Sequence, residues 1–456
     1  MGHPMFTYDP GMGDAIFEYC RDRLAMDPVP LDYGSTGEDP SAAIEGLLCE
    51  HGNDPGKVLE IFTTHLAAAV VSIDSPRFLA FIPNAPTKAS LLFDMVVSCS
   101  SLNGTSYLES AGVVVAENQL LAFLAERAGM PATSGGTFVS GGSIGNLSAL
   151  AVARDDGRRH HPEAGPRHLR AAISGEAHSS VNSALHLLGM DPLYVPTTDH
   201  MMTADALRAT LDADHDPSSV VAVVATAGTT NAGIVDEIEG IGQIATDRKL
   251  WYHVDAAYGG AAMLGRVRRD LFYGLRHADS FIVDPHKWLF APLDCCAILY
   301  RDPRLARTTH TQHASYLDVL HVKDEAGEVE WNPSDYAVHL SRRARGLPMW
   351  YSLAVHGTDL YADAIDRAIT TTEEAVALIN SLDHVELCRE PVLSIVLFRR
   401  RGWGPDDYNA WSRELLREQI AFVTPTKWEG ETVARFAFLH PDTTMEIVRE
   451  VLDSMA

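Results

Sequence analysis

Short apolar runs alternate with segments of helical periodicity between residues 136 and 300, and this alternation limits the possible folds more than any other feature of the chain. The strand-like runs are Gly136–Val139, Leu169–Ile173, Pro192–Val195, Val220–Ala225, Leu250–Val254, Ser280–Val283 and Cys296–Tyr300. Helical spacing of apolar residues occurs between several of them, at Ile144–Arg154, Ser179–Leu188, Ala204–Ala213 and Ile238–Arg248. The pattern predicts an α/β fold with a mostly parallel, doubly wound sheet and helices on both faces.

The segments on either side of this region predict two further parts. Apolar residues have helical spacing near the N-terminus at Asp14–Met26, Ser41–Glu50 and Pro55–Ile73. After Leu347, a long helical pattern to about Ser381 precedes strand-like runs at Val392–Arg399, Ala421–Thr424 and Arg435–Leu439. We therefore expect an N-terminal helical arm at 1–70, a large domain at 71–344 and a small α+β C-terminal domain at 345–456. The arm has little core of its own, so we expect it to pack on another surface, such as a second subunit.

The charge balance restricts the partners of this chain. Its 456 residues include 36 Lys and Arg against 61 Asp and Glu, a formal net charge of -25. Such an acidic chain repels nucleic acid and anionic membrane surfaces, so we expect neither as a partner. The six cysteines show no CxxC spacing, and the start of the chain lacks a signal-length apolar run. With no run of transmembrane length found either, we expect a cytoplasmic protein, and we expect no metal site.

Lys287 follows an apolar run in the sequence Asp279-Ser-Phe-Ile-Val-Asp-Pro-His-Lys-Trp-Leu289. Pro285 ends that run, which places Lys287 at a strand end, where open α/β sheets bind ligands. Because burial lowers the pKa of an ammonium, this lysine is a candidate nucleophilic amine that forms a Schiff base with a carbonyl. Taken alone, a partly exposed structural lysine is the better interpretation.

Two further strand ends carry groups that suit an anion and a ring. The segment Ser140-Gly-Gly-Ser-Ile-Gly-Asn146 opens a helix, where Gly142 lets the backbone approach a phosphate and Ser143 adds a hydroxyl. Asp255 ends the run Trp251-Tyr-His-Val-Asp255, and the small side chain of Ala257 leaves room beside it for a flat ring. Taken alone, the glycine segment is interpreted equally well as an ordinary glycine-rich helix start. Asp255, taken alone, is better interpreted as a structural carboxylate.

His178 and Thr230 stand at two more strand ends, in Ser174-Gly-Glu-Ala-His178 and Ala225-Thr-Ala-Gly-Thr-Thr230. An isolated histidine is usually structural. However, four strand ends together offer a phosphate cradle, an imidazole, a carboxylate and an amine at the edge where such sheets bind ligands. Their combination favours one shared cofactor site over four separate structural roles.

The run His253-Val-Asp-Ala-Ala-Tyr258, followed 32 residues after Asp255 by Lys287 in Pro285-His-Lys-Trp288, resembles the group II amino-acid decarboxylases. These enzymes depend on pyridoxal 5'-phosphate (PLP) and include the aromatic L-amino-acid decarboxylases. The similarity extends from Arg77 to Thr443. It implies a fold-type I PLP-dependent homodimer with active sites at the subunit interface.

The resemblance also implies a role for each matching residue. Lys287 is then the Schiff-base lysine, Asp255 the partner of the pyridine nitrogen and His178 the imidazole that stacks on the ring. The residues that hold the phosphate are then Gly142, Ser143 and His286, and those that touch the ring are Thr230 and Ala257. Phe81 and Pro83 match the segment that lines the substrate pocket of the aromatic decarboxylases.

This chain departs from the animal aromatic decarboxylases at two positions. Where they have Asn three residues before the lysine, this chain has Asp284. Because a carboxylate repels a phosphate, we expect Asp284 to turn aside or to contribute only its backbone. Those enzymes also return a proton to Cα from a tyrosine on a mobile loop, whose position is Pro333 here. Tyr336, after a loop expected at Lys323–Asp335, is the substitute candidate.

The expected reaction is decarboxylation of an L-amino acid, most simply an aromatic one, to the amine and carbon dioxide. Two alternatives use the same scaffold: decarboxylation coupled to oxidative deamination, which gives an aldehyde, and decarboxylation of an acidic or diamino acid. A third alternative is a regulatory protein of this fold without turnover, although Lys287 and Asp255 argue against it.

Overall fold

The central element of the computed structural model, which describes residues 3–32, 40–160, 169–322 and 329–456, is a seven-stranded sheet. Its order is β1-β7-β6-β5-β4-β2-β3. The strands are β1 (Gly135–Val139), β2 (Arg170–Ser174), β3 (Asp191–Val195), β4 (Val220–Thr226), β5 (Trp251–Asp255), β6 (Ser280–Val283) and β7 (Cys296–Tyr300). Strand β7 runs antiparallel to both neighbours, and the other pairs are parallel. The prediction of a mostly parallel sheet is confirmed.

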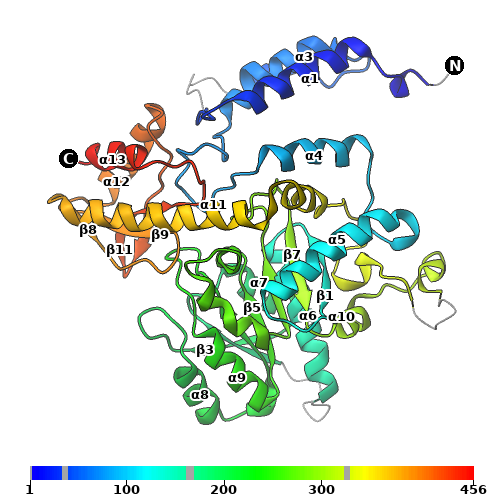
Figure 1. The fold of residues 1–456 in the computed structure, drawn as a ribbon, viewed down its shortest axis with the longest axis vertical. Helices are drawn as coiled ribbons and strands as arrows, with labels where there is room; N and C mark the ends of the chain where they lie inside the picture. Colours follow the sequence, from blue (N-terminus) through cyan, green and yellow to red (C-terminus); the bar gives the residue numbers. More distant parts are fainter. Residues whose placement is uncertain (1–2, 33–39, 161–168, 323–328) are drawn as a thin grey trace.

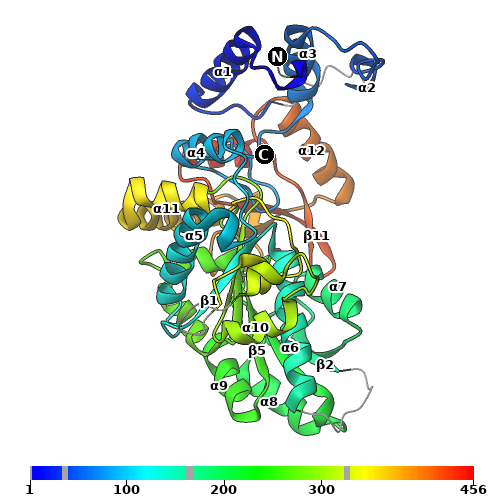
Figure 2. The same ribbon diagram turned by 90° about the vertical axis from the view of Figure 1, so that its right-hand side faces the viewer.

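Helices cover both faces of this sheet, so its strands are buried on both sides (Figures 1 and 2). Side chains alternate along each strand: Phe281 and Val283 pack into one apolar cluster, and Ile282 packs into the other. The first cluster lies under α5 (Tyr107–Arg127), α8 (Ala204–Ala213) and α9 (Ile238–Arg248). The second lies under α6 (Gly142–His160), α7 (Ser179–Leu188) and α10 (Pro303–His310).

Helix α5 and the preceding α4 (Lys88–Cys99) were not among the elements expected from the sequence. Within the described residues, α5 is long and apolar enough by composition to cross a membrane, contrary to the expectation that no run has transmembrane length. Its Leu120, Leu121 and Leu124 are nevertheless buried in the first apolar cluster of the large sheet. In this fold the apolar character of α5 serves core packing.

A second, antiparallel sheet has the order β10-β11-β9-β8. Its strands are β8 (Val385–Leu387), β9 (Ile395–Arg400), β10 (Thr426–Trp428) and β11 (Glu431–Ala437), and its helices are α11 (Leu347–Ser381), α12 (Pro405–Arg417) and α13 (Met445–Asp453). The strand expected at Ala421–Thr424 is wrong, because only Phe422 forms a bridge there, with Phe78. The division at residues 70 and 344 stays a proposal.

The N-terminal arm lies apart from the large sheet (Figure 2). Its helices are α1 (Pro10–Ala25), α2 (Pro40–Ala43) and α3 (Pro55–Ile61). The helix expected at Ser41–Glu50 is wrong beyond Ala43, where turns replace it.

Short 3₁₀ or π segments also occur along the described chain. They are η1 (Pro4–Phe6), η2 (Phe62–Leu66), η3 (Ala67–Ala69), η5 (Pro217–Ser219), η6 (Gly259–Met263), η7 (Arg269–His277), η8 (Asp318–His321) and η9 (Pro333–Tyr336).

Candidate active site

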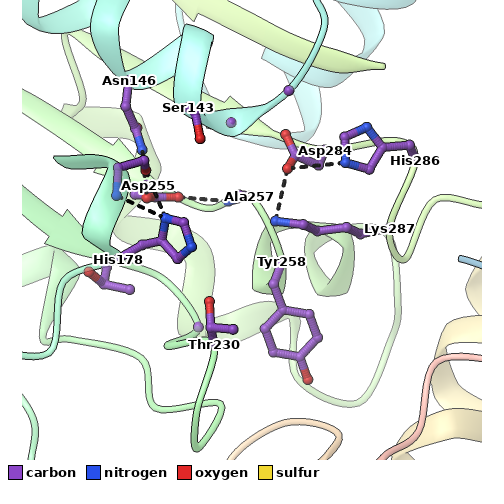
Figure 3. A pocket seen from close by; sticks show the side chains of 15 residues that line it. Ser143, Asn146, His178, Thr230, Asp255, Ala257, Tyr258, Asp284, His286 and Lys287 are labelled. Atoms are coloured by element: carbon purple, nitrogen blue, oxygen red, sulfur yellow. Dashed lines mark hydrogen bonds and ion pairs between the residues drawn. The ribbon is translucent and has the colours of Figure 1, made fainter. Parts of the chain in front are cut away.

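The carboxyl ends of β1, β2, β4, β5 and β6 surround a cavity of about 220 Å³ (Figure 3). Parallel strands place the residues that follow them at one edge of the sheet, so segments far apart in the sequence meet there. The lining residues are Gly141, Gly142, Ser143, Asn146, His178, Ser180, Thr226, Gly228, Thr230, Asp255, Ala257, Tyr258, Asp284, His286 and Lys287. The structure therefore brings eight of the candidate site residues, together with Asp284, to one cavity.

The first turn of α6 forms one wall of the cavity. A Cβ added to Gly142 would lie 3.3 Å from the Ala257 Cβ and 3.2 Å from Asp284 Oδ2, so a side chain here would have to push apart the residues that follow β5 and β6. Ser143 follows it and points its hydroxyl into the cavity (Figure 3). Free N–H groups at a helix start and the positive end of its dipole favour an anion at this wall.

Lys287 approaches the cavity from the opposite side, and its Nζ lies 2.9 Å from Asp284 Oδ2 (Figure 3). Burial alone would lower the pKa of this ammonium, but the charge and hydrogen bond of Asp284 outweigh burial, so the pKa lies above its usual value. Burial would likewise raise the pKa of Asp284, yet Lys287 and then His286 hold it below its usual value. The pair is thus ionised on both sides at neutral pH.

The position of Asp284 corrects the expectation that it would turn aside. The side chain is 1% exposed and lines the cavity. That expectation considered only repulsion from a phosphate and left out the adjacent ammonium of Lys287, whose attraction at 2.9 Å holds the carboxylate in place. His286 lies beside them, with its Nε2 3.6 Å from Asp284 Oδ2, and its Nδ1 accepts the backbone N–H of Cys295 at 2.9 Å.

Asp255 lies at the end of β5 with two hydrogen-bond donors on its carboxylate. Asn146 Nδ2 donates to Oδ2 at 2.9 Å, and the backbone N–H of Ala257 donates to Oδ1 at 3.1 Å. The side chain is 5% exposed. A carboxylate so placed keeps a fixed orientation at the wall of the same cavity that Lys287 lines.

His178 is the residue before α7 and lies on the Asp255 side of the cavity (Figure 3). Its Nδ1 accepts the backbone N–H of Ser180 at 3.2 Å and lies 2.8 Å from the Ser180 hydroxyl. This contact gives the ring one orientation. Thr230 lies below it in the same view and also lines the cavity.

Asn146, Thr226 and Tyr258 line the cavity but were not singled out as site residues from the sequence. Asn146 had a recognisable signal, because it lies one helical turn after Gly142 and therefore shares its face of α6. Thr226 is the last residue of β4, so its direction depends on the strand register, which the sequence does not reveal.

Tyr336 does not reach the cavity, which corrects its assignment as a proton donor. The side chain is 4% exposed and its ring stacks on Trp331, with centroids 4.1 Å apart. The loop expected at Lys323–Asp335 falls in part on residues 323–328, outside the described residues, and Asn332, Ser334 and Asp335 are buried. Tyr336 is therefore a core residue beside β1. The sequence prediction failed because counting from a motif gives the position of a residue in the chain but not its packing.

Phe81 and Pro83 do not line the cavity of their own chain either. Phe81 is 60% exposed, with a left-handed backbone at φ 50° and a ring tilted against Phe422 at 6.1 Å. Pro83 is buried. Their role at a substrate pocket stays a prediction.

The family of the chain follows from comparison with known proteins. The pyridoxal-dependent decarboxylase conserved domain matches residues 42–401. The chain belongs to this family. An aromatic-L-amino-acid decarboxylase from Bacillus atrophaeus is 30% identical over 88% of this chain and 85% of its own length. An L-2,4-diaminobutyrate decarboxylase from Rhizobium meliloti (strain 1021) is 30% identical over 84% of this chain and 78% of its own length.

A solved structure supports the same fold. Crystalline Oryza sativa TDC with PLP and tryptamine superposes with a TM-score of 0.88 over 100% of this chain and 99% of that chain, at 24% identity. The chain is therefore a PLP-dependent amino-acid decarboxylase of fold type I, and the predictions of family, fold, cofactor and reaction type are confirmed.

The residues of the cavity fit PLP. The amine of Lys287 can bind an aldehyde covalently, Asp255 presents a carboxylate to a ring nitrogen, and the start of α6 suits a phosphate. Thr226 Oγ1 and Asp284 Oδ1 are also buried at this cavity without a hydrogen-bond partner among the described residues. Such groups are satisfied by a polar ligand.

Proposed function

We propose that this decarboxylase acts on an aromatic L-amino acid and releases the amine and carbon dioxide, as a homodimer. The observation that carries the proposal is the shared cavity of Lys287 and Asp255, with His178 at its side (Figure 3). Bound PLP supplies an electron sink that accepts the electron pair left at Cα when carbon dioxide departs. The residues of this chain determine where that chemistry takes place.

Asp255 binds the ring nitrogen and keeps it protonated. Its two hydrogen-bond donors, Asn146 and the Ala257 backbone, hold the carboxylate in one orientation at the wall of the cavity. An ionised partner makes the ring cationic, which increases its capacity to withdraw electrons. Ala257 and Thr230 both line the cavity and would contact the ring. The small side chain of Ala257 leaves room for it.

Gly142, Ser143 and His286 hold the phosphate. The N–H groups of the first turn of α6 and the Ser143 hydroxyl supply donors, and the helix dipole adds a favourable potential. Before the cofactor binds, the Lys287 ammonium pairs with the Asp284 carboxylate at 2.9 Å, which offsets the repulsion between that carboxylate and an incoming phosphate. Lys287 would hold the cofactor through its amine.

His178 would cover the ring and pass the proton on its Nε2 to Cα, and solvent would return a proton to that nitrogen. Ser180 fixes its Nδ1, so Nε2 is the nitrogen available to the reacting atoms. This assignment replaces Tyr336, which is buried beside Trp331. A proton returned to Cα completes formation of the amine.

The preference for an aromatic substrate draws support from the Bacillus atrophaeus relative and from Phe81. Arg435 donates to the backbone oxygens of Phe81 at 2.7 Å and Thr230 at 2.5 Å, which ties the Phe81–Pro83 segment to an edge of the cavity. The exposed Phe81 ring is available to the cavity of a second subunit. A diamino acid is the second candidate, because of the Rhizobium meliloti relative.

An exposed apolar groove supports the homodimer. Helices α1 and α3 and the start of η2 form it from Met12, Ile16, Val58 and Phe62, each at least 40% exposed in the single chain. Apolar surface of this kind is usually buried in an interface. The free cysteines and the net charge of -25 support a cytoplasmic location without nucleic acid or membrane partners.

The test is a substrate panel. PLP-loaded protein is incubated with each of the twenty amino acids and with 2,4-diaminobutyrate, and carbon dioxide and organic products are measured by mass spectrometry. We expect the highest kcat/KM with an aromatic amino acid and the corresponding amine as product. A higher value for a diamino or acidic substrate would overturn the aromatic assignment, and an aldehyde with ammonia would overturn simple decarboxylation.

A further inference from the structure

Asn146 is the junction of a buried hydrogen-bond network behind the cavity. The side chain is 1% exposed, and its Nδ2 donates to both Asp255 Oδ2 and Ser180 Oγ at 2.9 Å. Its Oδ1 lies 2.9 Å from His253 Nε2. Both amide hydrogens and the carbonyl oxygen are therefore in use, and one side chain connects three others.

The hydrogen atoms on the His253 side of this network can be assigned from donor chemistry. Trp251 Nε1 can only donate, and it donates to Ser280 Oγ at 2.9 Å. The Ser280 hydroxyl then donates to His253 Nδ1 at 2.9 Å. His253 carries its proton on Nε2 and donates it to Asn146 Oδ1. A reversed amide would place an oxygen against the Asp255 carboxylate, so this orientation is the favoured one.

The same reasoning assigns the hydrogen on His178. The Ser180 backbone N–H donates to His178 Nδ1 at 3.2 Å, which makes Nδ1 an acceptor. The Ser180 hydroxyl accepts from Asn146 and therefore directs its own hydrogen to the same Nδ1 at 2.8 Å. Consequently the proton of neutral His178 resides on Nε2, the nitrogen left free of these contacts.

We propose that Asn146 is a positioning residue that couples the two reactive groups of this side of the cavity: it holds the Asp255 carboxylate and, through Ser180, sets the tautomer of His178. Each donor uses one hydrogen and no proton is transferred along the network. The network also requires a neutral His253, which accepts a hydrogen bond at Nδ1. Burial lowers the pKa of His253 to about 4, although Asp255 opposes this change, so His253 is neutral at pH 7. The functional meaning of the two groups rests on the proposed function; the network itself does not.

Isosteric substitution separates this role from packing. Asn146→Asp keeps the shape of the side chain but removes both donors and places a second carboxylate against Asp255. We expect PLP affinity of the purified apoprotein to fall about tenfold or more in both Asn146→Asp and Asn146→Ala. Asn182→Ala, on α7, is the matched control and should keep the wild-type affinity. Wild-type affinity in Asn146→Asp would overturn the proposal.

Ser180→Ala isolates the His178 branch. It leaves the Asn146 donor to Asp255 in place, so PLP affinity should stay within about threefold of wild type, while kcat falls about tenfold or more because the His178 ring loses its hydroxyl donor. Equal losses of affinity in Ser180→Ala and Asn146→Ala would show that Asn146 does not act on the two branches separately, and would contradict the proposal.

Neutron diffraction from deuterium-exchanged crystals of the unaltered protein tests the assignment even where a variant fails to fold. We expect deuterium on Nε2 of His178 and His253, none on their Nδ1 atoms, and the Asn146 amide nitrogen facing Asp255. Deuterium on Nδ1 of His178, or a reversed Asn146 amide, would refute the network. A protein with the expected deuterium positions that releases no carbon dioxide from any amino acid would refute the proposed function instead.

Discussion

The two ends of the cavity are held in different ways. At the Asp255 end, the carboxylate accepts two hydrogen bonds from neutral donors, and the buried side chains behind it are linked to one another. At the Lys287 end, the ammonium has one carboxylate partner, Asp284, and that partner keeps an oxygen without a hydrogen bond in the described structure. The Lys287 side chain is 23% exposed, whereas Asp255 is buried.

This contrast matches the two tasks of a PLP enzyme. A residue that binds the ring nitrogen must keep one position and one charge through the whole reaction, and a network of neutral donors provides that. A lysine that exchanges with the substrate amine must be released and bound again in each cycle, so a single ion pair at a partly open position suits it. The fixed end and the exchangeable end should therefore respond differently to mutation and to pH.

Removal of the amine should have the largest effect. We expect Lys287→Ala to lower kcat/KM about a thousandfold or more and to abolish the visible absorption of covalently bound cofactor, because among the described residues that line the cavity no other side chain is an amine. Lys427→Ala, at an exposed position of β10, is the control and should retain both. Activity of Lys287→Ala near the wild-type value would contradict the role given to this end.

Removal of the fixed carboxylate should have the second-largest effect. Asp255→Asn keeps the shape but lacks the charge that holds the ring nitrogen protonated, so we expect kcat to fall about a hundredfold or more while the protein still binds some PLP. Steady-state kinetics and cofactor content separate these two quantities. A kcat within a few-fold of wild type would show that the charge of Asp255 is not used.

Acid should weaken the Asp255 end through His253. Burial lowers the pKa of His253 to about 4, whereas an unfolded histidine titrates near 6.5. Between these values the unfolded chain binds more protons, so stability present above pH 6.5 is lost as the pH falls toward 4. Between pH 6.5 and 4 we expect His253→Gln to lose less unfolding free energy than the wild-type protein, and the difference should be on the order of 2 kcal/mol.

Urea unfolding at several pH values between 7 and 4 measures that loss. Burial also lowers the pKa values of His310 and His339 to about 4, so some acid sensitivity should remain in the variant. The difference between the two proteins isolates His253. An identical pH dependence would mean that the neutral state of His253 contributes nothing to this end of the cavity.

Neutralising Asp284 should give the smallest effect. Asp284→Asn removes the charge that raises the pKa of Lys287, so the lysine loses its proton at a lower pH than in the wild-type protein. We expect PLP to associate with the apoprotein roughly two- to fivefold faster at neutral pH, with its pH profile moved toward acid. Stopped-flow absorbance follows this association. A profile moved toward alkali would show that Asp284 does not stabilise the ammonium.

The sequence predicted that Lys287 and Asp255 would meet at one cavity because both follow buried strands. Lys287, Asp255, His178 and Gly142 each stand just after a strand-like run, and parallel strands bring such positions to one edge. No side-chain contact was needed for that inference. The network around Asn146 was missed because its hydrogen bonds depend on side-chain directions within a buried layer.

The errors have similar physical causes. Tyr336 had a suitable place in the sequence, but Trp331 stacks on it and buries it. Asp284 was judged against a phosphate alone, although the lysine three residues later was the nearer charge. Helical spacing at Ser41–Glu50 did not produce a helix beyond Ala43, since a short segment gains little from helix formation without a core to pack on.

The structure of the PLP-loaded protein tests the central claim most directly. A density map at a resolution that defines the ring orientation should show PLP bonded to Lys287, with its ring nitrogen beside the Asp255 carboxylate. A cofactor bonded to another lysine, or a ring whose nitrogen faces away from Asp255, would contradict the assignment of the two ends.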